Sequence, residues 1–166
     1  MRLALSTLAL SGLAAAPSQA ANLELSLDIP TISVAEYHRP YVAVWVERPD
    51  QSAVKTLTVW YNLKAKNQEG EKYLKDLRQW WRRGGRELSL AADGLTGPSR
   101  APGKQQVVFK APDLPAGQYS LVVEAAREAG GREVVRTPFQ WPPKARQVST
   151  VKGTSELGLV TLVAKP

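Results

Sequence analysis

The sequence predicts a mainly β fold, an immunoglobulin-like sandwich of two β-sheets with one inserted amphipathic helix. Two observations predict it. Seven short segments rich in β-branched and aromatic residues are separated by turn residues, and one further segment has apolar residues at helical spacing. The chain has 166 residues, of which 43% are hydrophobic, so one packed core is expected. We expect residues 1–20 to be a leader and residues 21–166 to form a single sandwich domain.

The N-terminal residues have the three parts of a secretory signal peptide. Arg2 supplies a positive charge, and residues 3–16 are apolar or small over a length too short to span a bilayer. Ser18 and Ala20 are the small residues expected just before a cleavage site. The sequence therefore predicts cleavage after Ala20, export to the bacterial periplasm, and no transmembrane segment in the mature chain.

The predicted strands follow from alternation and from the residues that end them. Residues 23–29 place leucine or isoleucine at every second position, and Pro30 ends the run. Residues 41–47 place three valines on one face, and we expect Trp45 and Trp60 to lie in the core. Prolines within and after the segment at 133–140 favour either an edge position or a loop for it. The remaining predicted strands comprise residues 55–61, 105–110, 118–126, 133–140 and 157–164.

One segment between strands has a different pattern. Residues 71–83 contain no β-branched residue, their apolar side chains recur at helical spacing, and Gly84 and Gly85 follow them. We predict one amphipathic helix here. The adjacent Trp80 and Trp81 cannot share a face of a helix. One of them should therefore pack inward, while the other is free to contact a partner or a flat ligand.

The composition excludes several classes of chemistry. The chain has no cysteine, which rules out thiolate chemistry, disulfides and iron–sulfur clusters. A single histidine, His38, makes it a poor candidate for a transition-metal site. No catalytic constellation is recognisable, so we assign no catalytic residue and no metal ligand. The net charge of +7 comes from scattered lysines and arginines without a nucleic-acid-binding motif, and it favours other anionic partners.

Two loops supply the candidate site residues. Residues 93–100 contain Asp-Gly and Gly-Pro, which are typical of an ordinary turn. The same loop presents the hydroxyl of Ser99 beside Arg100, whose guanidinium can bind a phosphate through two hydrogen bonds. His38 and Arg39 precede a predicted strand. His38 is either an ordinary loop histidine or a residue that contacts a ligand such as haem.

The loop resembles the sequence at which the exported flavin transferase ApbE attaches FMN, through a phosphoester, to serine or threonine. That pattern is Asp, two variable residues, Ser or Thr, Gly, Ala and the acceptor. Asp93, Thr96, Gly97 and Ser99 match it, whereas Pro98 stands where alanine is usual. The resemblance implies Ser99 as the acceptor of covalent FMN and Asp93 as a recognition residue. Proline at this position stiffens the loop and restricts Gly97.

The wider chain resembles a family of predicted periplasmic proteins of unknown function. The segments that carry the resemblance are residues 39–47, 72–81 and 93–103. The family is encoded near PepSY-type membrane reductases and the flavin transferase, in iron-acquisition contexts. This resemblance implies that those two membrane-associated proteins are partners.

Two functions follow from these expectations. The first is an accessory protein of an electron-transfer or iron-acquisition system that carries covalent FMN, with Arg100 pairing with the phosphate and Trp81 contacting the flavin ring. The second is a non-enzymatic binding or docking module for an anionic ligand, such as a ferric siderophore or haem, or for a membrane partner. In that second function the contacts would be made by His38, Arg39 and Trp80.

Overall fold

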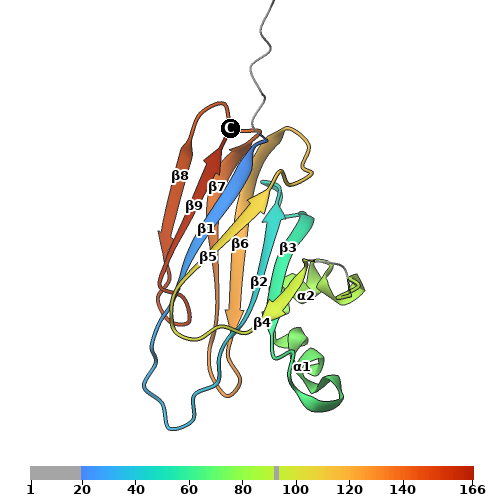
Figure 1. Ribbon diagram of the computed structural model, residues 1–166, viewed down its shortest axis with the longest axis vertical. Helices are drawn as coiled ribbons and strands as arrows, with labels where there is room; N and C mark the ends of the chain where they lie inside the picture. Colours follow the sequence, from blue (N-terminus) through green and yellow to red (C-terminus); the bar gives the residue numbers. More distant parts are fainter. Residues whose placement is uncertain (1–19, 92–93) are drawn as a thin grey trace, which may run out of the picture.

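Two β-sheets pack face to face in the computed structural model, which describes residues 20–91 and 94–166 (Figure 1). The strand orders are β5-β1-β9-β8 in one sheet and β4-β3-β2-β6-β7 in the other. Residues 1–19 of the expected leader and the proposed recognition residue Asp93 lie outside the described residues. The strands are β1 (Asn22–Ile29), β2 (Tyr41–Glu47), β3 (Ala53–Tyr61), β4 (Thr96–Pro98), β5 (Gly103–Lys110), β6 (Gly117–Ala126), β7 (Arg132–Trp141), β8 (Gln147–Lys152) and β9 (Leu159–Lys165).

The expectation of a mainly β, two-sheet sandwich is confirmed. Each of the predicted strands is present, with bounds shifted by no more than about two residues, as is usual for strand ends. The sequence analysis missed β4 and β8. The predicted edge position of β7 is confirmed, because β7 ends the five-stranded sheet and pairs with β6. The finer expectation, that the sandwich is immunoglobulin-like in detail, stays a prediction.

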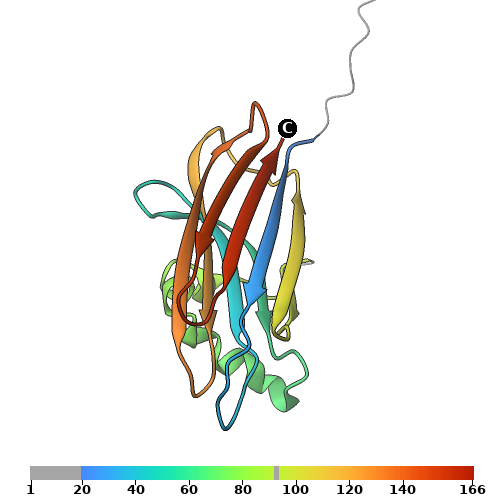
Figure 2. The same ribbon diagram turned by 90° about the vertical axis from the view of Figure 1, so that its left-hand side faces the viewer.

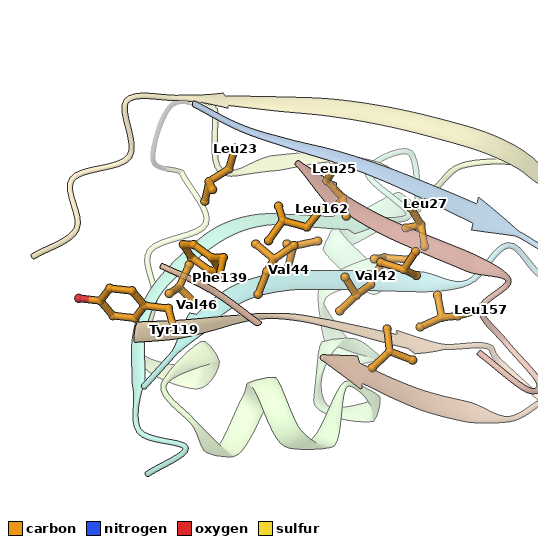
Figure 3. Packing of buried hydrophobic residues seen from close by; sticks show 14 of the residues in the cluster. Leu23, Leu25, Leu27, Val42, Val44, Val46, Tyr119, Phe139, Leu157 and Leu162 are labelled. Carbon is orange, nitrogen blue, oxygen red and sulfur yellow. The ribbon is translucent and has the colours of Figure 1, made fainter. Parts of the chain in front are cut away.

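The main core lies between the sheets, where alternate side chains of each strand point inward (Figure 3). Val42, Val44 and Val46 of β2 share this inner face, as expected, and face the apolar side chains of β1. Removing these side chains from water is the main favourable contribution to folding. The β1 residues in this core are Leu23, Leu25, Leu27 and Ile29.

The expected helical insertion between strands is present, but it is not one continuous helix over residues 71–83. That part of the chain forms short turns, which we call the helical segment (residues 66–87): η1 (Lys66–Gln68), α1 (Glu69–Lys72), η2 (Leu74–Asp76), α2 (Arg78–Arg82) and η3 (Gly85–Glu87). Leu77, with φ −74° and ψ 68°, leaves helical geometry between η2 and α2. The buried carboxylate of Glu124 accepts the backbone N–H groups of Gln79 and Trp80 in α2. These amides therefore need no carbonyl from a preceding helical turn.

The helical segment covers the outer face of the five-stranded sheet, on the side away from the other sheet (Figure 1). It packs Leu74, Leu77 and Trp80 against that face, so the central strand β2 is buried on both sides. The expectation that Trp45 and Trp60 lie in the core is confirmed, with exposed fractions of 1% and 2%. Among the described residues, no helix is both long and apolar enough to cross a membrane.

The expected loop before residue 103 contains β4, a strand parallel to the end of β3. Thr96 lies beside Val59, and Pro98 lies beside Tyr61. Backbone hydrogen bonds flank this pairing, from Val59 N to Leu95 O (2.8 Å) and from Ser99 N to Tyr61 O (2.9 Å). The segment that resembles a flavin attachment sequence is therefore part of the sheet edge.

Candidate functional site

Ser99 lines a hollow of about 280 Å³ at one end of the sandwich. We call it the serine hollow. The β1–β2 loop and the β6–β7 turn meet at this end, close to α1 (Figures 1 and 2). The hollow combines positive, negative, aromatic and hydroxyl side chains from separate parts of the chain. Its lining residues are Tyr37, His38, Arg39, Tyr41, Asn62, Ser99 and Glu128.

The position of Ser99 is set by β4. Its backbone N–H donates to the carbonyl of Tyr61, and its side chain is half-buried at the end of the strand. Gly97 is needed for packing as well, because a Cβ there would lie 3.2 Å from Cδ1 of the Trp60 indole. The expected loop is thus corrected in part: Ser99 follows a short strand at the edge of the sheet, where its side chain is partly accessible.

Arg100 lies beside Ser99 in the chain but has different contacts. Its guanidinium carbon lies 4.1 Å from the centre of the Trp60 ring, a cation–π contact. Its Nη1 donates to Oε1 of Gln105 at 3.4 Å. Arg100 is not among the residues that line the serine hollow. In this conformation it holds the start of the next connection rather than a phosphate at Ser99.

His38 and Arg39 are brought together with Ser99, although the sequence placed them in separate loops. The His38 side chain is 33% exposed and lies between two carboxylates: Nε2 is 3.0 Å from Glu36 Oε1, and Nδ1 is 3.6 Å from Glu128 Oε2. Arg39 is exposed at the rim. These contacts orient the imidazole, and they leave the guanidinium of Arg39 accessible to an anionic group.

A second hollow, of about 470 Å³, adjoins the first. We call it the arginine hollow. It lies between the helical segment and the β6–β7 turn, and Glu128 lines both hollows. A small depression lies between the two hollows. It shares Tyr41 with the serine hollow, Tyr73 with the arginine hollow and Glu128 with both. The side chains around the arginine hollow include Tyr73, Asp76, Arg78, Arg127, Glu128 and Arg132.

Arg127 and Glu156 form a buried ion pair beneath the turn. Arg127 Nε lies 3.0 Å from Oε2 and Nη2 lies 3.1 Å from Oε1, and the two side chains are 6% and 5% exposed. The pairing is bidentate, which fixes the guanidinium plane. Arg127 Nη1 is also buried, and it has no hydrogen-bond partner among the described residues.

Tyr37 lies close to this ion pair. The Arg127 guanidinium carbon is 6.0 Å from the centre of the Tyr37 ring, and Tyr37 Oη is likewise buried without a partner among the described residues. Burial raises the pKa of Tyr37 above its ordinary value of 10.0, against the opposing charge of Arg127. The phenol therefore keeps its proton at neutral pH. Tyr37 lines the serine hollow, Arg127 lines the arginine hollow, and each side chain has one buried donor without a partner among the described residues.

The two helical tryptophans line neither hollow. Trp80 is 1% exposed, and its Nε1 donates to Thr56 Oγ1 at 3.0 Å, so a partner cannot reach the side chain in this conformation. We therefore do not carry Trp80 forward as a contact residue. Trp81 is half-buried and tilts against Trp80, with ring centres 6.2 Å apart. The expectation that one ring packs inward is confirmed.

Sequence reasoning missed several residues of this end of the molecule. Tyr37 and Glu128 carry no motif, and Tyr41 is explained by its strand alone. Arg127 precedes the Gly130-Gly131 pair, which indicated a turn and nothing more. The Gly-Gly pair could have indicated a candidate site, because turns at the end of a sheet commonly line binding sites.

Comparison with known proteins identifies a family. The family model described as "Predicted periplasmic protein (DUF2271)" matches residues 22–159. A search of curated proteins and a search of solved structures each found no match. The family description agrees with the periplasmic localisation that the leader predicts. The chain therefore belongs to the DUF2271 family of predicted periplasmic proteins.

Proposed function

We propose that this protein is a periplasmic redox accessory that carries FMN in phosphoester linkage to Ser99. It would receive electrons from a PepSY-type membrane reductase and pass them on within an iron-acquisition system. The observation that carries the proposal is that Ser99 shares a hollow with His38, Arg39 and two tyrosines. A serine in an ordinary turn needs no such neighbours.

The lining of the serine hollow fits the phosphate end of FMN. A phosphoester is an anion with oxygen acceptors, and Arg39 and Asn62 offer N–H donors around Ser99. The buried hydroxyl of Tyr37 adds a donor that has no partner among the described residues. Bound FMN would supply reversible electron transfer, while these residues would hold its charged end and limit its movement.

The attachment step needs a transferase and FAD. The Ser99 Oγ–P bond would form as the pyrophosphate P–O bond of FAD breaks, AMP would leave, and the hydroxyl proton would pass to a base of the transferase. Ser99 can reach a foreign active site if β4 separates from β3. Pro98 favours this separation, because it has no N–H to donate to the sheet and it lies at the exposed edge.

Co-expression with the flavin transferase tests the proposal. The intact mass of the purified protein should increase by one FMN group, and Ser99→Ala should remove the increase. Ser33→Ala is the matched control, since Ser33 is an exposed serine in the β1–β2 loop, outside the residues lining the serine hollow, and its loss should leave the adduct unchanged. No adduct on the wild-type chain, with a transferase active on another substrate, would contradict the proposal.

A second candidate is a non-covalent binding module for an anionic ligand such as a ferric siderophore or haem, or for a membrane partner. The partly exposed imidazole of His38 beside the exposed Arg39 favours it. Titration of the unmodified protein with haem, followed by the Soret band, tests this function. A saturable change that His38→Gln abolishes would support it, and an unchanged spectrum would count against it.

A further inference from the structure

We infer that the arginine hollow is the subsite for the isoalloxazine ring of the flavin linked at Ser99. This inference rests on the proposed function and goes beyond it, because it assigns the ring to side chains of the β6–β7 turn and the helical segment. The carrier function requires the attachment alone and would hold with the ring elsewhere.

The two hollows share a lining residue and are joined by a small depression. The serine hollow holds the attachment point and has a volume of about 280 Å³, and the arginine hollow has about 470 Å³. Glu128 lines both, and Tyr41 and Tyr73 line the small depression that joins them. The smaller space suits the phosphate and the sugar chain, and the larger space suits the tricyclic ring.

The charges of the arginine hollow favour a neutral polar ring over a polyanion. Three arginines line it, but Arg127 is paired with Glu156, and Arg132 is paired with Glu124. The carboxylates of Asp76 and Glu128 line it as well. A polyanion would meet these carboxylates at close range, which costs affinity. The mixture of signs fits a ligand that both donates and accepts hydrogen bonds.

The isoalloxazine ring has such an edge. Its pyrimidine end presents two carbonyl oxygens with an N–H between them, so it needs donors and an acceptor close together. The guanidinium groups of Arg78 and Arg127 supply donors, and the carboxylate of Asp76 supplies an acceptor. The exposed ring of Tyr73 provides an aromatic surface on the same hollow.

Arg127 is held in place without help from a ligand. Glu156 binds its Nε and Nη2, and Gly130 packs against the guanidinium so closely that a Cβ at Gly130 would lie 2.4 Å from Cζ. Its Nη1 is the donor that has no partner among the described residues. A buried donor of this kind is normally satisfied, and a carbonyl oxygen of the flavin ring would satisfy it.

The test uses the flavin-carrying protein from co-expression and two exposed side chains of the hollow. Arg78→Gln and Tyr73→Leu should each raise the flavin fluorescence yield and reduce its visible circular dichroism, because the ring loses contacts. Arg78→Gln should also lower the midpoint potential, since a nearby positive charge stabilises reduced flavin. Arg82→Gln is the matched control, because Arg82 is exposed on the same short helix but does not line the hollow.

The outcomes separate the subsite from the carrier function. An adduct that forms normally in all variants, with unchanged fluorescence and dichroism, would overturn the subsite and leave the carrier function standing. A wild-type chain without any adduct would overturn the carrier function. In that case, riboflavin is titrated into the unmodified protein and its fluorescence is measured. Saturable quenching of the riboflavin fluorescence that Tyr73→Leu weakens would support the subsite. No quenching would overturn the subsite.

Discussion

The carboxylate of Glu124 accepts the backbone N–H of Trp80 at 2.7 Å, although the two residues lie 44 positions apart in the chain. Glu124 is fully buried on β6, and it also accepts from Gln79 N and from Arg132 Nη1. This one side chain therefore ties the helical segment to the sheet and to the first residue of β7. Both walls of the arginine hollow depend on it.

Glu124→Gln should loosen the helical segment while preserving the shape of the side chain. The amide of glutamine is uncharged, and its NH₂ group would face an N–H group that the carboxylate had accepted. We therefore expect a loss of about 1.5–3 kcal/mol in the free energy of unfolding. Urea denaturation measures the loss, and hydrogen exchange at the Trp80 amide should become faster. Glu69→Gln, at an exposed surface position, is the control and should change stability little. Equal effects of the two variants would contradict the prediction.

Glu133 should make stability depend on acidic pH. Partial burial raises its pKa, but the backbone N–H groups of Thr154, Leu157 and Ser155 and the Thr154 hydroxyl outweigh this and lower the pKa from 4.5 to about 2. Because the folded-state pKa is depressed, the stabilisation is fully present above the unfolded value and is lost as the pH falls through the folded value.

Urea denaturation of the wild type and Glu133→Gln across this range measures the effect. The stability difference between the two proteins should be largest above about pH 4.5 and should shrink steadily toward about pH 2. Glu87→Gln, at an exposed position, should show no such trend. A difference that stays constant between these pH values would show that the carboxylate charge does not hold the loop at residues 154–157.

Gly85→Ala should destabilise the helical segment through a direct clash. A Cβ at this position would lie 2.6 Å from Cδ2 of the buried Trp80 ring, and that ring has no room to move. Overpacking of this kind costs about 1–3 kcal/mol. Thermal unfolding and near-ultraviolet circular dichroism of the tryptophans measure it. Lys75→Ala, at an exposed position in η2, is the control, and an unchanged Tm for Gly85→Ala would refute the contact.

Arg127→Met should cost more than a surface substitution, because it leaves the carboxylate of Glu156 buried without its partner. The expected loss is about 3–5 kcal/mol, measured by urea denaturation. Adding Glu156→Leu should recover part of the loss, although the Gly131 N–H then loses its acceptor. If the double variant is less stable than Arg127→Met alone, the ion pair is not the source of the effect.

The strands were predictable where burial is regular. Residues of β1 alternate because one face alone is covered, and in β2 a run of apolar residues follows from burial on both faces. β8 was missed because its two valines, Val148 and Val151, lie three positions apart and therefore do not alternate, and because the strand is half exposed at a sheet edge. β4 was missed because Thr-Gly-Pro is typical of a turn, and its pairing with β3 depends on a long-range parallel contact.

The candidate site was predictable only in part. Ser99, His38 and Arg39 were singled out for their chemistry, and the structure brings them to one hollow. Their proximity depends on how three connections meet at the sheet end, which no local pattern contains. The interruption of the predicted helix was missed for a similar reason, since the carboxylate that accepts from Gln79 N and Trp80 N comes from Glu124 in β6. Local periodicity carries no information about such a distant acceptor.

The pairing of β4 with β3 makes any modification of Ser99 a question of timing. The strand from Thr96 to Pro98 can pair only when its partner β3 is already in place. Under the proposed function, a transferase that arrives before this step meets an open chain, whereas one that arrives afterwards must wait for a local opening of the sheet edge. The yield of flavinylated protein would then depend on whether the transferase acts before or after β4 pairs with β3.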